Sequence, residues 1–106
     1  MFGTLAKMRV KPGGDVLLMA WSQALMGNNI NGHVSSTVYR STEDPRVLWL
    51  SVVFESEEAY KANAASPEQH RRWQQMRSVI EDDIEWHDGH VLMHGNVKDV
   101  WSVSGR

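Results

Sequence analysis

The segment that most limits how this chain can fold is residues 47–54. Its sequence is VLWLSVVF, in which Ser51 is the only polar residue, so an extended strand here has apolar side chains on both faces. Helices of the same chain can cover one of these faces, but the sequence offers no obvious cover for the other. A second subunit is the simplest cover, and we therefore expect a homodimer.

Hydropathy patterns before and after this strand predict two more strands and a first helix. Residues 2–10 and 33–40 alternate with period two, which is typical of strands. Between them, residues 16–26 form an apolar helical stripe about 200° wide. Asp15 is positioned to be the N-cap of this helix. So wide a stripe predicts that more than one neighbouring element covers the helix.

The second half of the chain predicts an interrupted helix and a final strand. Ser56 is suited to be an N-cap, and a new helical start follows at Ser66-Pro67. The helix is expected to continue to about residue 81. Residues 84–95 are strand-like but contain the turn-forming pair Asp88-Gly89, which predicts either a bulged strand or a small hairpin.

The resulting β-α-β-β-α-β order is that of an α+β protein with ferredoxin-like topology. It predicts a four-stranded antiparallel sheet with both helices on one face and an apolar dimerisation surface on the other. We assign residues 1–95 to this domain. Residues 96–106 form a C-terminal tail, which is either an extra strand or an arm onto a partner.

Composition excludes several classes of protein. The chain has 106 residues, enough for one compact domain, and its 11 basic and 13 acidic residues give no reason to expect nucleic acid or an anionic membrane as partner. An RNA-binding module of the same topology would read bases from its third strand, whereas the segment at 47–54 is suited to packing on another sheet. The absence of cysteine excludes disulfides, thiolate catalysis and cysteine-bound metal clusters. With no membrane-length apolar run and no complete signal peptide, a cytoplasmic protein is expected.

His70 is the first candidate for a catalytic residue, because histidine exchanges protons near neutral pH. On its helix it lies about 60° from Trp73, at the edge of the apolar stripe, and Arg77 borders the same stripe. A polar group beside an aromatic surface is typical of a pocket for a flat organic ligand. The alternative is that His70 and Arg77 only cover the edge of the core.

Asn63 is the second candidate. It falls between Ala59 and Tyr60 on the inward arc of its helix, where a carboxamide costs about 1–3 kcal/mol unless it is hydrogen-bonded. The partner is either a ligand or the helix end near Ser66. We expect further side chains to contact a substrate, with core packing as the alternative for the tryptophans: Trp21, Tyr60, Trp73 and Arg77.

Three further histidines do not predict a metal site. His87, His90 and His94 lie in strand-like sequence, where His90 and His94 would share a face about 13 Å apart. One metal ion with bonds of about 2 Å cannot be shared across that gap. The chain also lacks nucleotide-binding motifs, so we expect no metal or other cofactor.

The segment at residues 54–73, FESEEAYKANAASPEQHRRW, resembles a known family. An apolar strand ending in an aromatic residue, then S-x-E-A-Y, then S-P-x-x-H, is similar to the antibiotic biosynthesis monooxygenase domain of the dimeric α/β-barrel superfamily. The likeness covers about residues 2–95. It implies a homodimer whose sheets pack face to face, with a pocket in each subunit between sheet and helices.

The resemblance also implies a reaction without metal or flavin. A protein base deprotonates an electron-rich aromatic of the quinol or anthrone type, and the carbanion reduces O₂ directly. His70 would be the base, Asn63 a polar anchor and Trp73 a wall of the pocket.

Two alternatives remain. Haem-degrading members of the family use an Asn in the first strand, a Trp in the second helix and a later His as iron ligand. Here Thr4 is nearest to the first position, Asn63 takes the place of the Trp, and the ligand position falls near Trp73. These differences disfavour haem degradation and leave haem binding through His70 open. The other alternative is a non-catalytic dimer that binds a small hydrophobic molecule or another protein.

Overall fold

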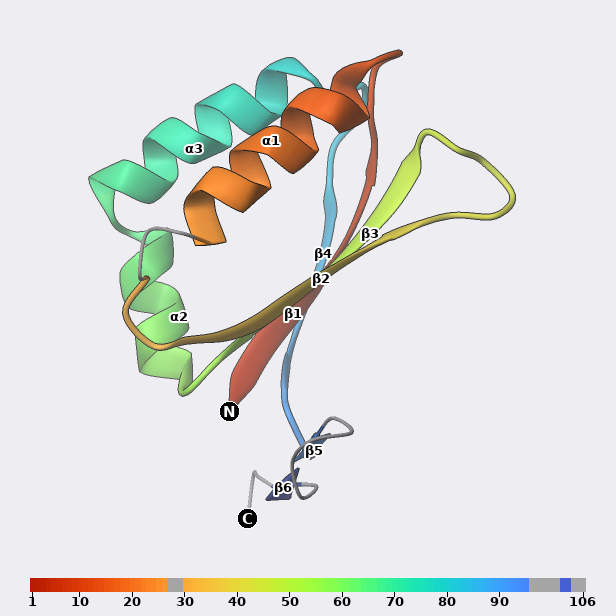
Figure 1. Ribbon diagram of the computed structural model, residues 1–106. Coiled ribbons are helices and arrows are strands. Elements are labelled where there is room, and N and C mark those ends of the chain that lie inside the picture. The colour runs from red at the N-terminus through yellow and green to blue at the C-terminus, as the bar shows by residue number, and fades with distance from the viewer. Residues whose placement is uncertain (27–29, 96–101, 104–106) are drawn as a thin grey trace.

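The computed structural model describes residues 1–26, 30–95 and 102–103. In chain order its elements are β1 (Phe2–Arg9), α1 (Gly14–Met26), β2 (His33–Arg40), β3 (Val47–Phe54), α2 (Glu57–Ala64), α3 (Pro67–Ser78), β4 (Glu85–His90), β5 (Met93–His94) and β6 (Ser102–Val103). The antiparallel sheet has the order β2-β3-β1-β4, and the helices α1, α2 and α3 lie on the same face of it (Figure 1). The α+β, ferredoxin-like prediction is therefore confirmed.

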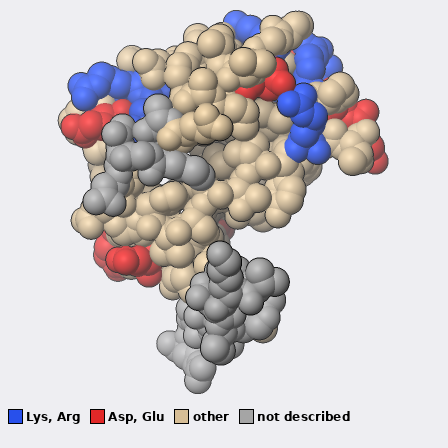
Figure 2. Space-filling model, viewed as in Figure 1, with Lys and Arg blue, Asp and Glu red and all other residues tan. Residues whose placement is uncertain are grey.

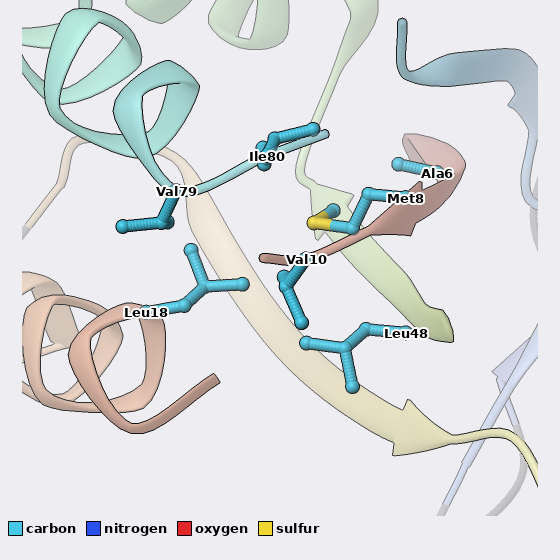
Figure 3. Packing of buried hydrophobic residues seen from close by; sticks show 7 residues of the cluster. All are labelled: Ala6, Met8, Val10, Leu18, Leu48, Val79 and Ile80. Carbon is cyan, nitrogen blue, oxygen red and sulfur yellow. The ribbon is translucent and has the colours of Figure 1, made fainter. Parts of the chain in front are cut away.

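The hydrophobic core lies between the sheet and the helices (Figure 3). It is formed by apolar side chains of β1, α1 and β3 and of the residues that directly follow β1 and α3: Ala6, Met8, Val10, Leu18, Leu48, Val79 and Ile80. Val10 and Ile80 are only 1% and 2% exposed, and a backbone bridge joins these two residues. Burial of such a side chain stabilises the fold by about 1.5–3 kcal/mol. The end of α3 is thus fixed to the end of β1.

Serine caps explain why α2 and α3 are separate helices. The Ser56 hydroxyl accepts a hydrogen bond from the Ala59 backbone N–H at 3.1 Å, and the Ser66 hydroxyl accepts one from the Gln69 N–H at 3.1 Å. Pro67 occupies the first turn of α3, where its missing N–H is not needed. Both predicted helix starts are confirmed.

The first helix differs from the prediction in its start and in its buried face. Asp15 lies inside the first turn and pairs with Arg40 at 2.8 Å instead of capping the helix. Leu18 is buried, whereas Val16 and Leu17 are 69% and 49% exposed, so the buried stripe is narrower than the sequence predicted. Among the described residues, no helix is long and apolar enough to cross a membrane.

The last strand of the sheet also differs from the prediction. β4 pairs with β1 without interruption from Lys7↔Glu85 to Phe2↔His90, so Asp88-Gly89 forms neither a bulge nor a hairpin. Beyond β4, Met93 pairs with Val103 in the two-stranded β5–β6 unit. The remainder of the predicted tail, residues 96–101 and 104–106, lies outside the described residues.

The face of the sheet opposite the helices carries exposed apolar side chains. Trp49 of β3 is 40% exposed between Tyr39 of β2, at 59%, and Lys7 of β1, whose ammonium lies 5.2 Å from the Trp49 ring. Leu5 of β1 is 54% exposed on the same face. No described segment covers these side chains, as the composition of residues 47–54 led us to expect.

Candidate functional site

A row of aromatic rings crosses the sheet beneath α2. His33, Phe54, Phe2 and His90 are paired neighbours on β2, β3, β1 and β4, and they lie on the helix face. Tyr60 of α2 lies over this row, with its ring centroid 5.2 Å from that of Phe2 and 5.7 Å from that of Phe54. Such tilted and edge contacts are favourable for aromatic pairs. The row therefore fixes α2 over the end of the sheet.

The next row on this face of the sheet is mostly polar and consists of Ser36, Val52, Thr4 and Asp88. The Tyr60 hydroxyl donates a hydrogen bond to Asp88 Oδ1 at 3.1 Å. Beside this pair, Thr4 Oγ1 is buried and has no hydrogen-bond partner within the described residues. Burial raises the pKa of Tyr60, and the nearby Asp88 carboxylate adds to the rise. The Tyr60 phenol is therefore a neutral donor at physiological pH.

A cavity of about 290 Å³ opens on the other side of α2. It lies between residues 30–31, α2 and the first turns of α3, and is lined by Ile30, Asn31, Ala59, Ala62, Asn63, Ser66, Glu68 and Arg72. Gly32 fixes the wall formed by residues 30–31. Its φ is 79°, and a Cβ there would lie 2.6 Å from Ala59 Cβ, so only glycine lets this segment approach α2.

Asn63 is the predicted site residue that the structure places in this cavity. Its Nδ2 is 3.5 Å from Gln69 Oε1, which is a long and weak hydrogen bond. Its backbone oxygen accepts from the Ser66 hydroxyl at 2.8 Å, so the backbone and not the side chain closes the end of α2. The carboxamide is therefore available to a ligand.

His70 does not lie among the residues that line the cavity. At about 100° per residue, it is on the side of α3 opposite Glu68 and Arg72. Its ring is exposed, and its Nε2 is 3.4 Å from the amide nitrogen of Gln74 on the same helix. The structure thus separates His70 from Asn63, and the role of His70 as a base stays a prediction.

The other predicted contact residues lie outside the cavity lining. Trp73 faces β4, with its ring centroid 6.0 Å from that of Trp86, and Trp21 packs against the core. Arg77 donates to the Ile80 carbonyl at 3.0 Å and pairs with Asp83 at 3.6 Å, so it holds the end of α3. Tyr60 belongs to the aromatic row.

Arg72 is a cavity residue that sequence reasoning missed. Its guanidinium donates to Gln69 Oε1 at 3.1 Å. The one signal for it in the sequence is the break at Ser66-Pro67, which turns the first two turns of α3 against α2.

Charged side chains lie around the margin of the molecular face in Figure 2, and uncharged residues form its centre.

The histidines in and after β4 point to different places. His90 lies on the helix face, His87 lies on the open face, and His94 Nε2 is 3.3 Å from the Ser35 hydroxyl. Within residues 1–26, 30–95 and 102–103, no group of three or more His, Asp or Glu side chains is placed to hold a metal ion.

Comparison with known proteins gives a family match over most of the chain. The family described as antibiotic biosynthesis monooxygenase matches residues 1–76. No protein of curated function matches the sequence.

Solved structures share the fold. A protein from Chloroflexus aurantiacus that bears the family's name has 25% identity and a TM-score of 0.65, covering 84% of this chain and 92% of that one. A variant of SnoaB, a cofactor-independent oxygenase from Streptomyces nogalater, has 14% identity and a TM-score of 0.71, with 92% and 97% covered. A conserved protein from Methanosarcina mazei has 18% identity and a TM-score of 0.74, with 83% and 89% covered. The last two likenesses show the fold alone. From the match over residues 1–76, the chain belongs to the antibiotic biosynthesis monooxygenase family.

Proposed function

We propose that this protein oxygenates a small electron-rich aromatic molecule, of the quinol or anthrone type, in the cavity lined by Asn63 and without a metal ion or flavin. The observation that carries the proposal is the position of Asn63, whose weakly bonded carboxamide lies in the cavity within the family-matching segment. The name of SnoaB as a cofactor-independent oxygenase supports the same class of reaction.

The reaction balances without a cofactor. An anthrone-type substrate loses a proton from its activated methylene, and the resulting carbanion passes one electron to O₂. Recombination of the two radicals forms a C–O bond and, after protonation, a hydroperoxide. Loss of water then leaves a carbonyl, so one oxygen atom enters the product and the other leaves as water.

Asn63 has a defined task in this reaction. Loss of the methylene proton leaves negative charge that is delocalised onto the conjugated ring oxygen of the substrate, which becomes an oxyanion. Donation from Asn63 Nδ2 to this oxyanion stabilises the deprotonated substrate and so lowers the pKa of the methylene. Arg77 has no part in the proposal, because its guanidinium is engaged at the Ile80 carbonyl.

The substrate can lie in one of two positions, which differ in the group that receives its proton. With the substrate beside Asn63, the open cavity lets the proton pass to solvent. With the substrate on the other side of α3, beside Trp73, His70 would take the proton instead. The position of Asn63 favours the first arrangement, and variants of the two residues distinguish them.

The test is O₂ uptake by metal-stripped protein with an anthrone and with a quinol. Asn63→Ala is expected to lower turnover by at least about tenfold. Gln75→Ala removes an equivalent carboxamide from an exposed position of α3 and should leave turnover unchanged. A strong loss in His70→Ala with normal activity in Asn63→Ala would place the reaction beside Trp73. If no aromatic consumes O₂ above background, the function is non-catalytic ligand binding.

We propose further that a second copy of the chain covers the open face of the sheet. The exposed side chains of Leu5, Tyr39 and Trp49 lie on the three neighbouring strands β1, β2 and β3 and form the contact surface, since a contiguous exposed apolar patch marks an interaction site.

A further inference from the structure

Arg72 is a cation in the cavity that has no anionic partner among the described residues. Arg71 lies 3.9 Å from Glu68 and Arg77 lies 3.6 Å from Asp83, whereas the guanidinium of Arg72 contacts the neutral amide of Gln69. We propose that the cavity is specific for aromatic molecules that carry a carboxylate, and that Arg72 holds this group. The inference rests on the proposed function and names the substrate class of the same site.

The neighbours of Arg72 suit an anion attached to a ring. Asn63 contributes amide N–H donors, and Ile30, Ala59 and Ala62 contribute apolar surface for the ring. The cavity also includes Ser66, the N-cap of the twelve-residue helix α3, where the positive end of the helix dipole favours negative charge. A planar guanidinium matches a carboxylate with two parallel hydrogen bonds, which a single phenol oxygen cannot accept in the same way.

Glu68 is an acidic residue on the cavity wall, and it acts against the binding of an anion. Its side chain is 59% exposed, and its nearest cation is Arg71. Solvent therefore screens its repulsion of a ligand at Arg72. The proposal consequently predicts that removal of the Glu68 charge raises the affinity for a carboxylate ligand and that removal of the Arg72 charge lowers it.

The cavity volume limits the size of the ligand. About 290 Å³ is at the lower end of the range of roughly 300–1,000 Å³ that is usual for small-molecule sites. This volume suits a small aromatic ligand, and naphthalene derivatives are suitable probes because their two fused rings leave room for the carboxylate.

The experiment is calorimetric titration at pH 7 with 2-naphthoate and with its neutral analogue 2-naphthamide. The carboxylate is expected to bind at least about tenfold more tightly than the amide. Arg72→Gln should abolish this preference, and Glu68→Gln should increase carboxylate affinity. Arg71→Gln changes net charge by the same amount on the same helix and should have little effect.

Three results would overturn the proposal: equal affinity for both probes, equal losses in Arg72→Gln and Arg71→Gln, or no binding of 2-naphthoate. None of these results decides whether the protein is an oxygenase, because uptake of O₂ with an uncharged quinol is measured separately. Conversely, carboxylate binding without O₂ uptake would retain the Arg72 site and remove the catalytic function.

Discussion

The buried hydroxyl of Thr4 makes a prediction at the scale of a single residue. An unpartnered buried hydroxyl costs about 1–3 kcal/mol, and Thr4→Val removes it while keeping the shape of the side chain. This substitution should raise the free energy of unfolding in urea by about 1 kcal/mol. Thr42→Val, at an exposed position between β2 and β3, is the control and should change the free energy of unfolding little. A loss of stability in Thr4→Val would mean that the hydroxyl bonds to Tyr60 in solution.

The raised pKa of Tyr60 makes a second residue-scale prediction. The folded protein disfavours the phenolate, so the unfolded chain loses this proton first as the pH rises. The stabilising contribution is complete below the unfolded value of about 10 and is lost as the pH rises through the folded value. Unfolding free energies between pH 8 and 11 should therefore fall more steeply for the parent than for Tyr60→Phe. Parallel curves would contradict this assignment.

At the scale of elements, the two serine caps form a matched pair. Ser56 and Ser66 each accept a backbone N–H at 3.1 Å, but only Ser66 lines the cavity. Replacement of either by alanine should lower the free energy of unfolding by about 1 kcal/mol. Ser66→Ala should in addition weaken binding of 2-naphthoate, whereas Ser56→Ala should not. Equal affinities in the two variants would show that the start of α3 does not contribute to the site.

Local signals in the sequence predicted most of the elements. The cap at Ser66-Pro67 was correctly predicted because capping depends on a few adjacent residues. The turn preference of Asp88-Gly89 misled us, because an unbroken ladder of pairs with β1 outweighs it.

The site was only partly predictable, since its walls come from separate elements. Helical periodicity placed Asn63 on an inward arc, and it does line the cavity. The same periodicity placed His70 beside Trp73, but it cannot tell which neighbour occupies that edge of α3. For the same reason Arg72, on the edge that faces residues 30–31, was missed.

At the scale of the whole molecule, two exposed tryptophans test the proposed dimer. Trp49 is 40% exposed on the open face and Trp86 is 43% exposed on the helix face. The parent should sediment as a dimer at micromolar concentration. Trp49→Asp should give a monomer, because a carboxylate would be buried in the contact, whereas Trp86→Asp should remain dimeric. A monomeric parent, or a dimeric Trp49→Asp, would rule out this interface.

The cavity walls on α2 and α3 have a consequence for how such a protein can change. Neither helix contains a buried residue, so the side chains at Ala62, Asn63, Glu68 and Arg72 are not part of the core. Substitutions at exposed positions usually alter stability by no more than about 0.5 kcal/mol. Ligand preference can therefore change during evolution, or be diversified in a combinatorial library, with little change in the free energy of unfolding.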